Sequence, residues 1–303
     1  MATEIPFRRE FTFEYAKPEQ LTPLIRRVLA RNPSPFTFKG TGTYIIGHGK
    51  VAVIDPGPDL PDHVDALSHA LVGETVTHIL VTHTHRDHSP AAAPLKHLTG
   101  AKTYAYGPHG SRRPEERFGG VVEEGGDRDF VPDVELREGD AVEGPGWHLA
   151  AVETPGHTSN HLCFALAEEH TLFSGDHVMG WSTSVIAPPD GDMAAYMRSL
   201  DKLLKRDDQV YWPTHGPSII APKPHVAAFI AHRRERSDAI LHALAAGDQT
   251  IPAIVARVYV GLDPRLIAAA GRSVLAHLIE LVEEERVFCD GPPSADARYR
   301  LKR

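Results

Sequence analysis

A short run of metal-binding side chains stands out in the sequence. His83, His85, Asp87 and His88 place three imidazoles and a carboxylate within six residues. Nitrogen and oxygen donors of this kind suit zinc or a similar transition metal. The run directly follows the apolar segment 75–81, and the end of a buried strand is where a rigid scaffold meets solvent. We therefore interpret it as a metal-binding loop that is able to supply two ions.

Four side chains do not fill two sites, because catalytic zinc usually takes about three protein ligands and a water. Three later segments each place a His or Asp beside a glycine after an expected strand, and their metal-binding residues are His157, Asp176 and His215. Glycine lets the backbone turn sharply at a strand edge. Each segment alone is equally consistent with a structural turn. The prediction therefore rests on the three segments as a set.

Short β runs interleaved with helices would position this chemistry. Strands are expected at Thr43 to Ile46, Val51 to Ile54, Thr75 to Val81, Lys102 to Ala105, Asp140 to Val142, His148 to Val152, His161 to Leu166, Thr171 to Phe173 and Gln209 to Trp212. Helical spacing predicts helices at Leu60 to Leu71 and Met193 to Leu204. The mixture of strands and helices indicates an α/β sandwich.

A second part of the chain begins near Ala221, where closely spaced prolines interrupt regular structure. Beyond it, helices are expected at Pro224 to Ala246, Ile251 to Val258 and Leu266 to Glu284, followed by two strands within Val287 to Leu301. Helices followed by a β-hairpin resemble a winged helix. We therefore predict a catalytic domain at 1–221 and a winged-helix-like domain at 222–303.

Composition restricts the class of protein. The 303 residues are 42% hydrophobic and 24% charged, as in a soluble globular protein with room for two domains. Because no apolar stretch approaches the roughly 18 to 20 residues that span a bilayer, we expect a cytoplasmic protein with no membrane partner. Cys163 and Cys289 are the only cysteines, which excludes a disulfide framework and a cysteine-rich zinc site. The net charge of -8 argues against nucleic-acid binding through phosphate contacts.

The chain resembles the metallo-β-lactamase superfamily of hydrolases. The resemblance rests on Asp55 with Gly57, then His83, His85, Asp87 and His88, then His157, Asp176 and His215, in that order between Thr43 and Gly216. It implies a four-layer αββα sandwich with two metals at one edge of the sheets. It also implies that His83, His85 and His157 hold the first metal, that Asp87, His88 and His215 hold the second, that Asp176 bridges them and that Asp55 supports them from behind.

Hydrolysis follows from this set of ligands. Two divalent ions, zinc in preference to iron or manganese, would share a water, lower its pKa towards about 7 and hold the bridging hydroxide as nucleophile. Asp87 would orient that hydroxide and help to return a proton to the leaving group. His161 would contact substrate or support the structure, and His177 would support the ligands rather than bind metal.

The substrate stays open among three hypotheses. Histidine at position 85 distinguishes the chain from the diiron flavoproteins, and Asp176 in place of a cysteine argues against antibiotic hydrolysis. Within the superfamily, the sequence pattern is most similar to that of two groups. One is the glyoxalase II-like proteins, and the other is a lactamase-like group with a C-terminal winged helix that includes a mitochondrial endoribonuclease. A small thioester or ester is therefore favoured. The alternatives are a single-stranded RNA endonuclease and a non-enzymatic nucleic-acid-binding protein.

The C-terminal domain would shape substrate choice without contributing to the metal centre. Arg233, Arg234 and Arg236 lie on one expected helix, where they form either a solvated face or a contact for RNA. A small-molecule partner is preferred to RNA, and formation of a homo-oligomer stays open.

Overall fold

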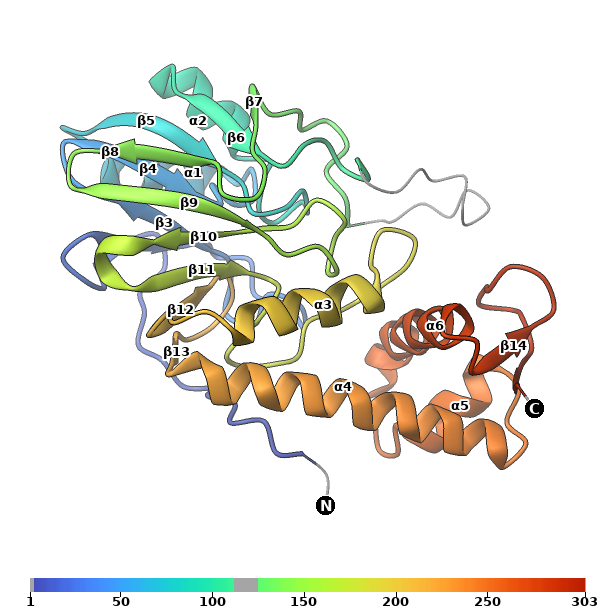
Figure 1. Cartoon of the computed structure of the whole chain (residues 1–303). Coiled ribbons are helices and arrows are strands. Elements are labelled where there is room, and N and C mark those ends of the chain that lie inside the picture. Colours follow the sequence, from blue (N-terminus) through green and yellow to red (C-terminus); the bar gives the residue numbers. More distant parts are fainter. Residues whose placement is uncertain (1–2, 112–124, 303) are drawn as a thin grey trace.

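Two β-sheets packed face to face, each covered on its outer side by helices, form most of the computed structural model, which describes residues 3–111 and 125–302 (Figure 1). The first sheet has the order β1-β2-β3-β4-β5-β6-β7 and the second β13-β12-β11-β10-β9-β8. Their strands are β1 Pro18–Gln20, β2 Ile25–Leu29, β3 Gly42–Ile46, β4 Lys50–Ile54, β5 Thr75–Leu80, β6 Lys102–Ala105, β7 Val134–Glu135, β8 Ala141–Gly144, β9 Trp147–Glu153, β10 Leu162–Leu166, β11 Thr171–Gly175, β12 Val210–Pro213 and β13 Ile219–Ile220.

The helical layers complete a four-layer αββα sandwich, which confirms the fold expected from the sequence. Helices α1 (Pro61–Ala70) and α2 (Ala92–Thr99) cover the first sheet, and α3 (Met193–Leu204) and α4 (Pro222–Ala245) cover the second. Tyr44 of the first sheet and Phe164 of the second belong to the apolar layer between the sheets. Apolar packing on both faces of both sheets therefore fixes their positions.

Parallel pairing brings strand ends to a common edge. Strands β4, β5 and β6 run parallel because α1 and α2 return the chain to the start of the next strand, and β11 and β12 are also parallel. Residues that follow the carboxyl ends of such strands meet at one edge of the sheet. The candidate metal-binding segments follow β5, β9, β11 and β12, and β9 runs in the same direction as β11 because both are antiparallel to β10, so the topology itself gathers them.

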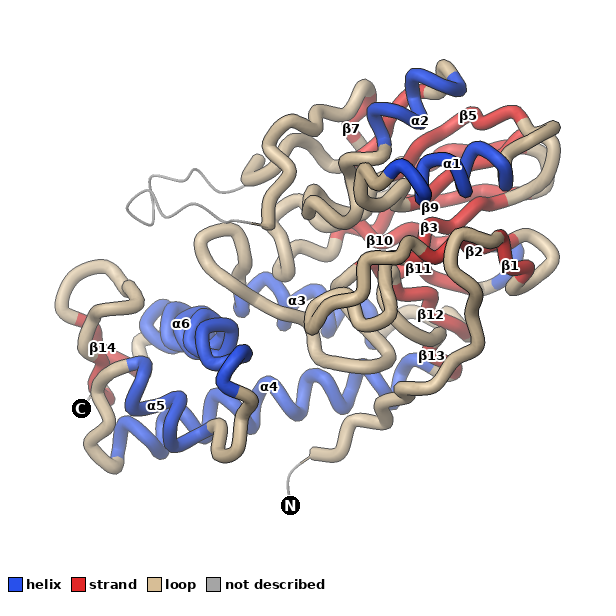
Figure 2. Tube along the Cα trace, turned by 180° about the vertical axis from the view of Figure 1, so that it is seen from behind, coloured by secondary structure: helices blue, strands red, loops and turns tan. Residues whose placement is uncertain are grey.

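The C-terminal part has its own apolar core. It consists of the end of α4, then α5 (Ile251–Val258), α6 (Ile267–Glu283) and the hairpin of β14 (Val287–Cys289) and β15 (Tyr299–Leu301) (Figure 2). Short 3-10 helices occupy Ala167–Glu169 and Pro264–Leu266. Helices followed by a two-stranded wing match the winged-helix arrangement expected from the sequence.

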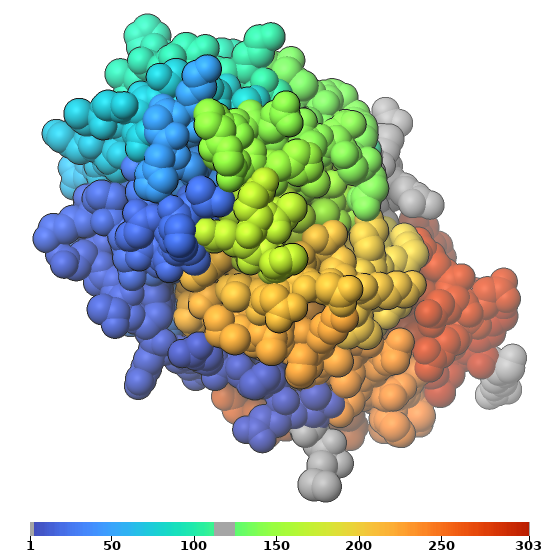
Figure 3. Space-filling model, turned by 60° about the vertical axis from the view of Figure 1, so that its left-hand side comes forward, coloured from blue at the N-terminus to red at the C-terminus, as the bar shows by residue number. Residues whose placement is uncertain are grey.

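Helix α4 joins the two parts without interruption. Phe229 in its first half packs under the second sheet, whereas Ile240 in its second half packs in the C-terminal core. In the space-filling view the C-terminal residues form a lobe beside those of α3 and α4 (Figure 3). The boundary predicted near Ala221 coincides with the start of this shared helix, and the division into 1–221 and 222–303 stays a prediction.

In the described residues, 3–111 and 125–302, no helix combines the length and the apolar character needed to cross a bilayer.

Candidate metal centre

The imidazoles of His83, His85 and His157 converge at the edge of the sandwich. Nε2 of His83 lies 3.0 Å from Nδ1 of His85, and Nε2 of His157 lies 3.1 Å from the same Nδ1. Burial and the neighbouring imidazoles hold the pKa of His83 well below its ordinary value. The neutral imidazole is the form that binds zinc. The three residues predicted to hold the first metal are therefore brought together, and their donor atoms are close enough to share one ion.

Asp87, His88 and His215 form a second trio, and Asp176 lies between the two. Oδ2 of Asp87 is 3.1 Å from Nε2 of His215 and 3.5 Å from Nε2 of His88. Oδ1 of Asp176 is 3.4 Å from Nε2 of His215, whereas its Oδ2 lies between the trios, 3.8 Å from Nε2 of His157 and 3.7 Å from Nε2 of His88. One carboxylate thus directs its two oxygens toward both trios, as a bridging ligand must.

The carboxylates set the charge of the second trio. Burial alone lowers the pKa of His215, but Asp176 and Asp87 outweigh it and raise that pKa to about 10. Burial likewise opposes ionisation of Asp87, yet His88 and His215 hold its pKa well below the ordinary value. Both carboxylates of the site are therefore held in the ionised form that binds metals, and they attract positive charge to the space between them.

Buried polar atoms in this cluster fit a metal better than they fit one another. Nε2 of His88, Nε2 of His215 and Oδ1 of Asp176 are buried, and among the described residues they have ion-pair contacts but no hydrogen bond of good geometry. Buried polar atoms in proteins almost always have hydrogen-bond partners. All three face the centre of the cluster, so a divalent cation would satisfy them together. The donor set of imidazoles and carboxylates is also the one that zinc, iron and manganese accept.

In four of the candidate histidine ligands, the ring nitrogen Nδ1, which faces away from the cluster, contacts a fixed acceptor. An N–H on Nδ1 directed at a fixed acceptor leaves the lone pair of Nε2 facing the metal, which sets both tautomer and orientation. The pairs are His83 with the Thr82 hydroxyl at 3.0 Å, His88 with Asp55 at 2.9 Å, His157 with the Val185 carbonyl at 2.6 Å and His215 with the Gly40 carbonyl at 3.1 Å.

Asp55 lies fully buried behind the candidate ligands. Its carboxylate accepts hydrogen bonds from the Thr82 N–H at 2.7 Å, the Thr82 hydroxyl at 2.8 Å and the Thr214 hydroxyl at 2.7 Å, in addition to that from His88. These donors follow β5 and β12, while Asp55 follows β4. One carboxylate therefore ties together three strand ends from both sheets.

His161 and His177 are both buried, and their contacts differ. Nδ1 of His161 lies 2.8 Å from the Thr154 hydroxyl, and its Nε2 accepts the N–H of Asp176 at 3.2 Å. Because both nitrogens bond within the protein, support is favoured over substrate contact for His161. The ring of His177 lies beside that of Tyr196, with centroids 4.5 Å apart, and its carbonyl accepts the Tyr196 hydroxyl.

Three threonines that support the candidate metal ligands were not identified in the sequence analysis. Thr82, Thr154 and Thr214 each lie within two residues of a strand end, and each bonds to Asp55 or His161. The recurrence of threonine between a strand end and a candidate histidine is the signal that identifies them. The acceptor carbonyls of Gly40 and Val185 carry no such signal, because any residue type provides a carbonyl.

Stacked aromatic rings stand next to the centre. Phe38 and Trp181 have ring centroids 4.7 Å apart and an interplanar angle of 14°. Phe38 is two residues before Gly40, whose carbonyl contacts His215. Trp181 covers Gly216, where an added Cβ would come within 2.7 Å of the indole. The pair thus lies on the two segments that adjoin His215, through Gly216 and Gly40.

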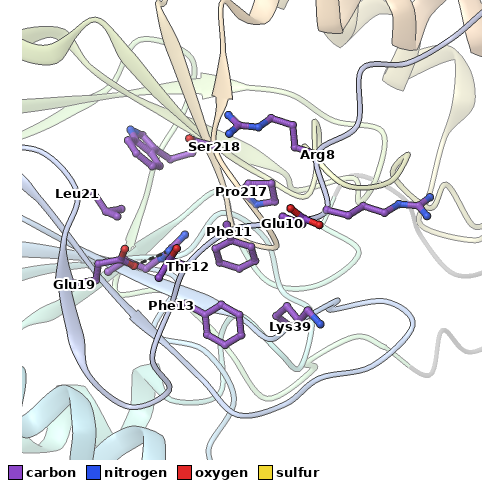
Figure 4. Close-up of a pocket in the computed structure, with 13 residues that line it drawn as sticks. Arg8, Glu10, Phe11, Thr12, Phe13, Glu19, Leu21, Lys39, Pro217 and Ser218 are labelled. Atoms are coloured by element: carbon purple, nitrogen blue, oxygen red, sulfur yellow. Dashed lines mark hydrogen bonds and ion pairs between the residues drawn. The ribbon is translucent and has the colours of Figure 1, made fainter.

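A separate cavity of about 810 Å³ lies along the N-terminal segment (Figure 4). Phe11 and Phe13 line it with ring centroids 4.9 Å apart, and in it Arg27 forms an ion pair with Glu19 at 2.7 Å. The cavity reaches Lys39 but includes none of the candidate metal ligands. We therefore locate the chemistry at the strand ends rather than in this cavity.

Gly156→Ala should destabilise the loop that presents His157. At Gly156 the φ angle is +147°, and an added Cβ would lie 2.3 Å from Cα of Tyr196. Backbone strain and overpacking together predict a loss of about 2 to 4 kcal/mol in the free energy of unfolding, together with reduced metal content. Gly139→Ala is the control, because Gly139 has a φ of +83° but no atom near the added Cβ. Equal losses in guanidinium unfolding of the two variants would refute the packing argument.

Two family descriptions match the chain: Metallo-beta-lactamase superfamily over residues 37–215 and Beta-lactamase associated winged helix domain over residues 250–292. Lactamase-like protein adaB of Aspergillus niger is 29% identical over 97% of this chain and 95% of its own length. An atrochrysone carboxyl ACP thioesterase of Claviceps purpurea is 31% identical over 75% of this chain and 67% of its own. A metallo-beta-lactamase family protein from Thermus thermophilus has a crystal structure that superposes with a TM-score of 0.75 at 26% identity, covering 93% of this chain and 100% of that one.

Proposed function

This chain belongs to the metallo-beta-lactamase superfamily and is a hydrolase, and we propose that it hydrolyses a small acyl thioester or ester with two divalent metal ions. The position of Asp176 carries the proposal of two ions. Its oxygens face a trio of histidines on one side and the trio of Asp87, His88 and His215 on the other. A site for one ion would need only one of these trios.

The residues that would hold the ions are those predicted from the sequence. His83, His85 and His157 would bind the first and Asp87, His88 and His215 the second, with Asp176 shared. When bound, such ions, zinc in preference to iron or manganese, supply a water of lowered pKa and polarise the scissile carbonyl.

Asp87 is the residue best placed to handle protons. Its side chain is 28% exposed, whereas that of Asp176 is 11% exposed, so Asp87 is the more accessible of the two carboxylates. Its carboxylate would orient the attacking water, accept a proton from it as the carbon–oxygen bond forms, and pass that proton to the leaving thiolate as the carbon–sulfur bond breaks. Phe38 and Trp181 would hold the acyl group and exclude bulk water.

A thioester is favoured over other acyl compounds by similarity. The relative from Claviceps purpurea is named as a thioesterase that acts on an acyl group held by a carrier protein. Thiolates are good leaving groups, and the stacked rings beside the centre offer a flat apolar surface to an acyl chain. We therefore infer that a carrier-linked or coenzyme-linked acyl thioester is the substrate class.

Single-stranded RNA is less well supported than a thioester as the substrate. The net charge is -8, and the arginine face considered for RNA is mostly occupied within the protein. Arg233 is buried, and Arg236 donates to the Val258 carbonyl at 3.2 Å, which leaves Arg234 as the exposed member. No observation favours a non-enzymatic role, since every ligand position predicted from the sequence carries a metal-binding side chain.

Activity on acyl thioesters should be lost on chelation and regained with zinc. The pure protein is assayed against aromatic and aliphatic acyl thioesters of coenzyme A, lactones, a β-lactam and labelled single-stranded RNA. We expect the thioesters to give the highest kcat/KM. A strong chelator should lower it by at least about a hundredfold, because ligand residues alone do not activate water. Recovery should need close to two equivalents of zinc.

The same panel decides between the functions. Cleavage of RNA without thioester turnover, together with RNA binding at low salt, would establish the nuclease instead. Recovery that is complete at one equivalent of zinc would contradict the proposal of two ions while leaving the hydrolase in place.

A further inference from the structure

Arg233 is a buried arginine on the face of α4 that meets the catalytic part of the protein. Its side chain is 4% exposed, and α4 runs along α3 beneath the second sheet (Figure 1). The guanidinium donates from Nη2 to the carbonyl of Ser184 and lies over the ring of Tyr196, 5.3 Å from its centroid. Within the described residues no carboxylate forms an ion pair with it. Burial of such a charge is costly, so its placement is specific to these partners.

Ser184 in turn contacts the segment that follows Asp176. The hydroxyl of Ser184 donates to the carbonyl of His177 at 2.8 Å, and the hydroxyl of Tyr196 donates to the same carbonyl at 2.9 Å. Arg233 therefore touches both residues whose hydroxyls hold the carbonyl of His177, the residue that follows the candidate bridging ligand Asp176.

The next residue along the chain contacts the other trio. Val185 directly follows Ser184, and its carbonyl lies 2.6 Å from Nδ1 of His157. A shift of the Ser184 carbonyl would move that of Val185, because adjacent peptide planes share a Cα atom. The orientation of the His157 ring thus depends on a segment that Arg233 holds from α4.

The far end of this segment is fixed independently. The Asp190 carboxylate accepts the N–H of Ser159 at 2.9 Å, and the N–H of Asp192 donates to the Gly156 carbonyl at 2.8 Å. These bonds secure the segment from residue 190 onward. The stretch around Ser184 is held by the bond from Arg233, by the bond from the Ser184 hydroxyl to the His177 carbonyl and by the buried side chain of Ile186.

We propose that Arg233 is a positioning residue for the metal centre: from the helix shared with the C-terminal domain, it holds the segment that orients His157 and Asp176. The inference rests on the proposed metal site and assigns to the C-terminal part a share in metal affinity. Arginine suits this position because its planar group donates in its plane while its face lies on an aromatic ring. A lysine ammonium provides the charge without that geometry.

Metal affinity tests this assignment directly. Arg233→Met should weaken zinc binding to the chelator-treated protein by about ten- to a hundredfold, measured by competition with a chromophoric chelator. Arg233→Lys should recover part of the loss. Arg234→Met is the matched control, since Arg234 is exposed one residue further along the same helix, and its affinity should equal that of the unchanged protein. With the thioester substrate, kcat should fall while KM changes little.

Zinc affinity, rather than thermal stability, decides this assignment. An Arg233→Met protein that binds zinc as tightly as the unchanged protein overturns the assignment, whatever its unfolding temperature. If Arg233→Met does not fold, Arg233→Lys takes its place, because it keeps the charge and removes the planar group that contacts Ser184 and the Tyr196 ring. Zinc affinity in Arg233→Lys equal to that of the unchanged protein then overturns the assignment. Failure of the unchanged protein to bind zinc would instead refute the proposed metal site itself.

Discussion

Asp176→Ala should lose at least about a hundredfold in hydrolytic activity and release part of the bound metal. Among the residues that the structure describes, Asp176 is the one carboxylate whose oxygens face both trios, so its removal takes a ligand from each candidate site at once. It also leaves His215 without one of the two carboxylates that raise its pKa. Activity toward the thioester and metal content by elemental analysis are measured on the same preparation.

The control for this variant is Asp65→Ala. Asp65 is exposed on α1, away from the strand ends, and its replacement should leave both quantities unchanged. Asp176→Asn should fall between the two, since an amide keeps one oxygen for one ion. Full activity and full metal content in Asp176→Ala would eliminate the bridging assignment, even if the other ligands proved correct.

The positions of the candidate ligands could be predicted because each follows a strand that is legible in the sequence. Strand β5 is an apolar, β-branched run, and the metal-binding loop begins within three residues of its end. Helix α3 was predicted with its observed bounds, because its apolar spacing is regular and Asp192 caps its start by accepting the N–H of Ala195 at 2.9 Å. Local patterns of this kind need no knowledge of distant contacts.

Elements whose stability depends on distant partners were not predicted. Strand β2 contains Arg26 and Arg27, which break an apolar pattern. The structure pairs Arg26 with Glu74 at 2.8 Å and Arg27 with Glu19 at 2.7 Å. Strands β1, β7 and β13 have only two or three residues, too few to show a period. Helix α2 was also missed.

The contact between the C-terminal domain and the segment behind the metal centre also could not be predicted, because it joins residues far apart in the sequence. The sequence predicted that the domain would not contribute to the metal centre, and all candidate ligands do precede Gly216. The bond from Arg233 to Ser184 nevertheless reaches the segment behind those ligands. A lone arginine in a helix gives no sign of the backbone carbonyl it will meet, so only the packing of α4 against the catalytic part reveals the contact.

Asp55→Ala should destabilise the protein more than any other substitution behind the centre. Four hydrogen bonds end on its carboxylate, from the N–H and hydroxyl of Thr82, from Thr214 and from His88, and all are buried. Removing a buried acceptor leaves each of its donors without a partner, which costs about 1 to 3 kcal/mol of stability per donor, although the hydroxyls can partly reorient. We therefore expect the free energy of unfolding to fall by about 3 to 5 kcal/mol, measured with guanidinium in the presence of a chelator.

Asp133→Ala is a matched control for this loss. Asp133 also accepts bonds from a backbone N–H and a hydroxyl, those of Thr103, but its side chain is 30% exposed and lies outside the candidate metal cluster. Water replaces lost bonds at such a position, so the loss should stay near about 1 kcal/mol and zinc affinity should not change. In Asp55→Ala zinc affinity should drop by about ten- to a hundredfold, because Nδ1 of His88 no longer has the acceptor that fixes its tautomer. Equal stability losses in the two variants, with equal zinc affinities, would show that Asp55 is an ordinary buried carboxylate rather than the support of the metal centre.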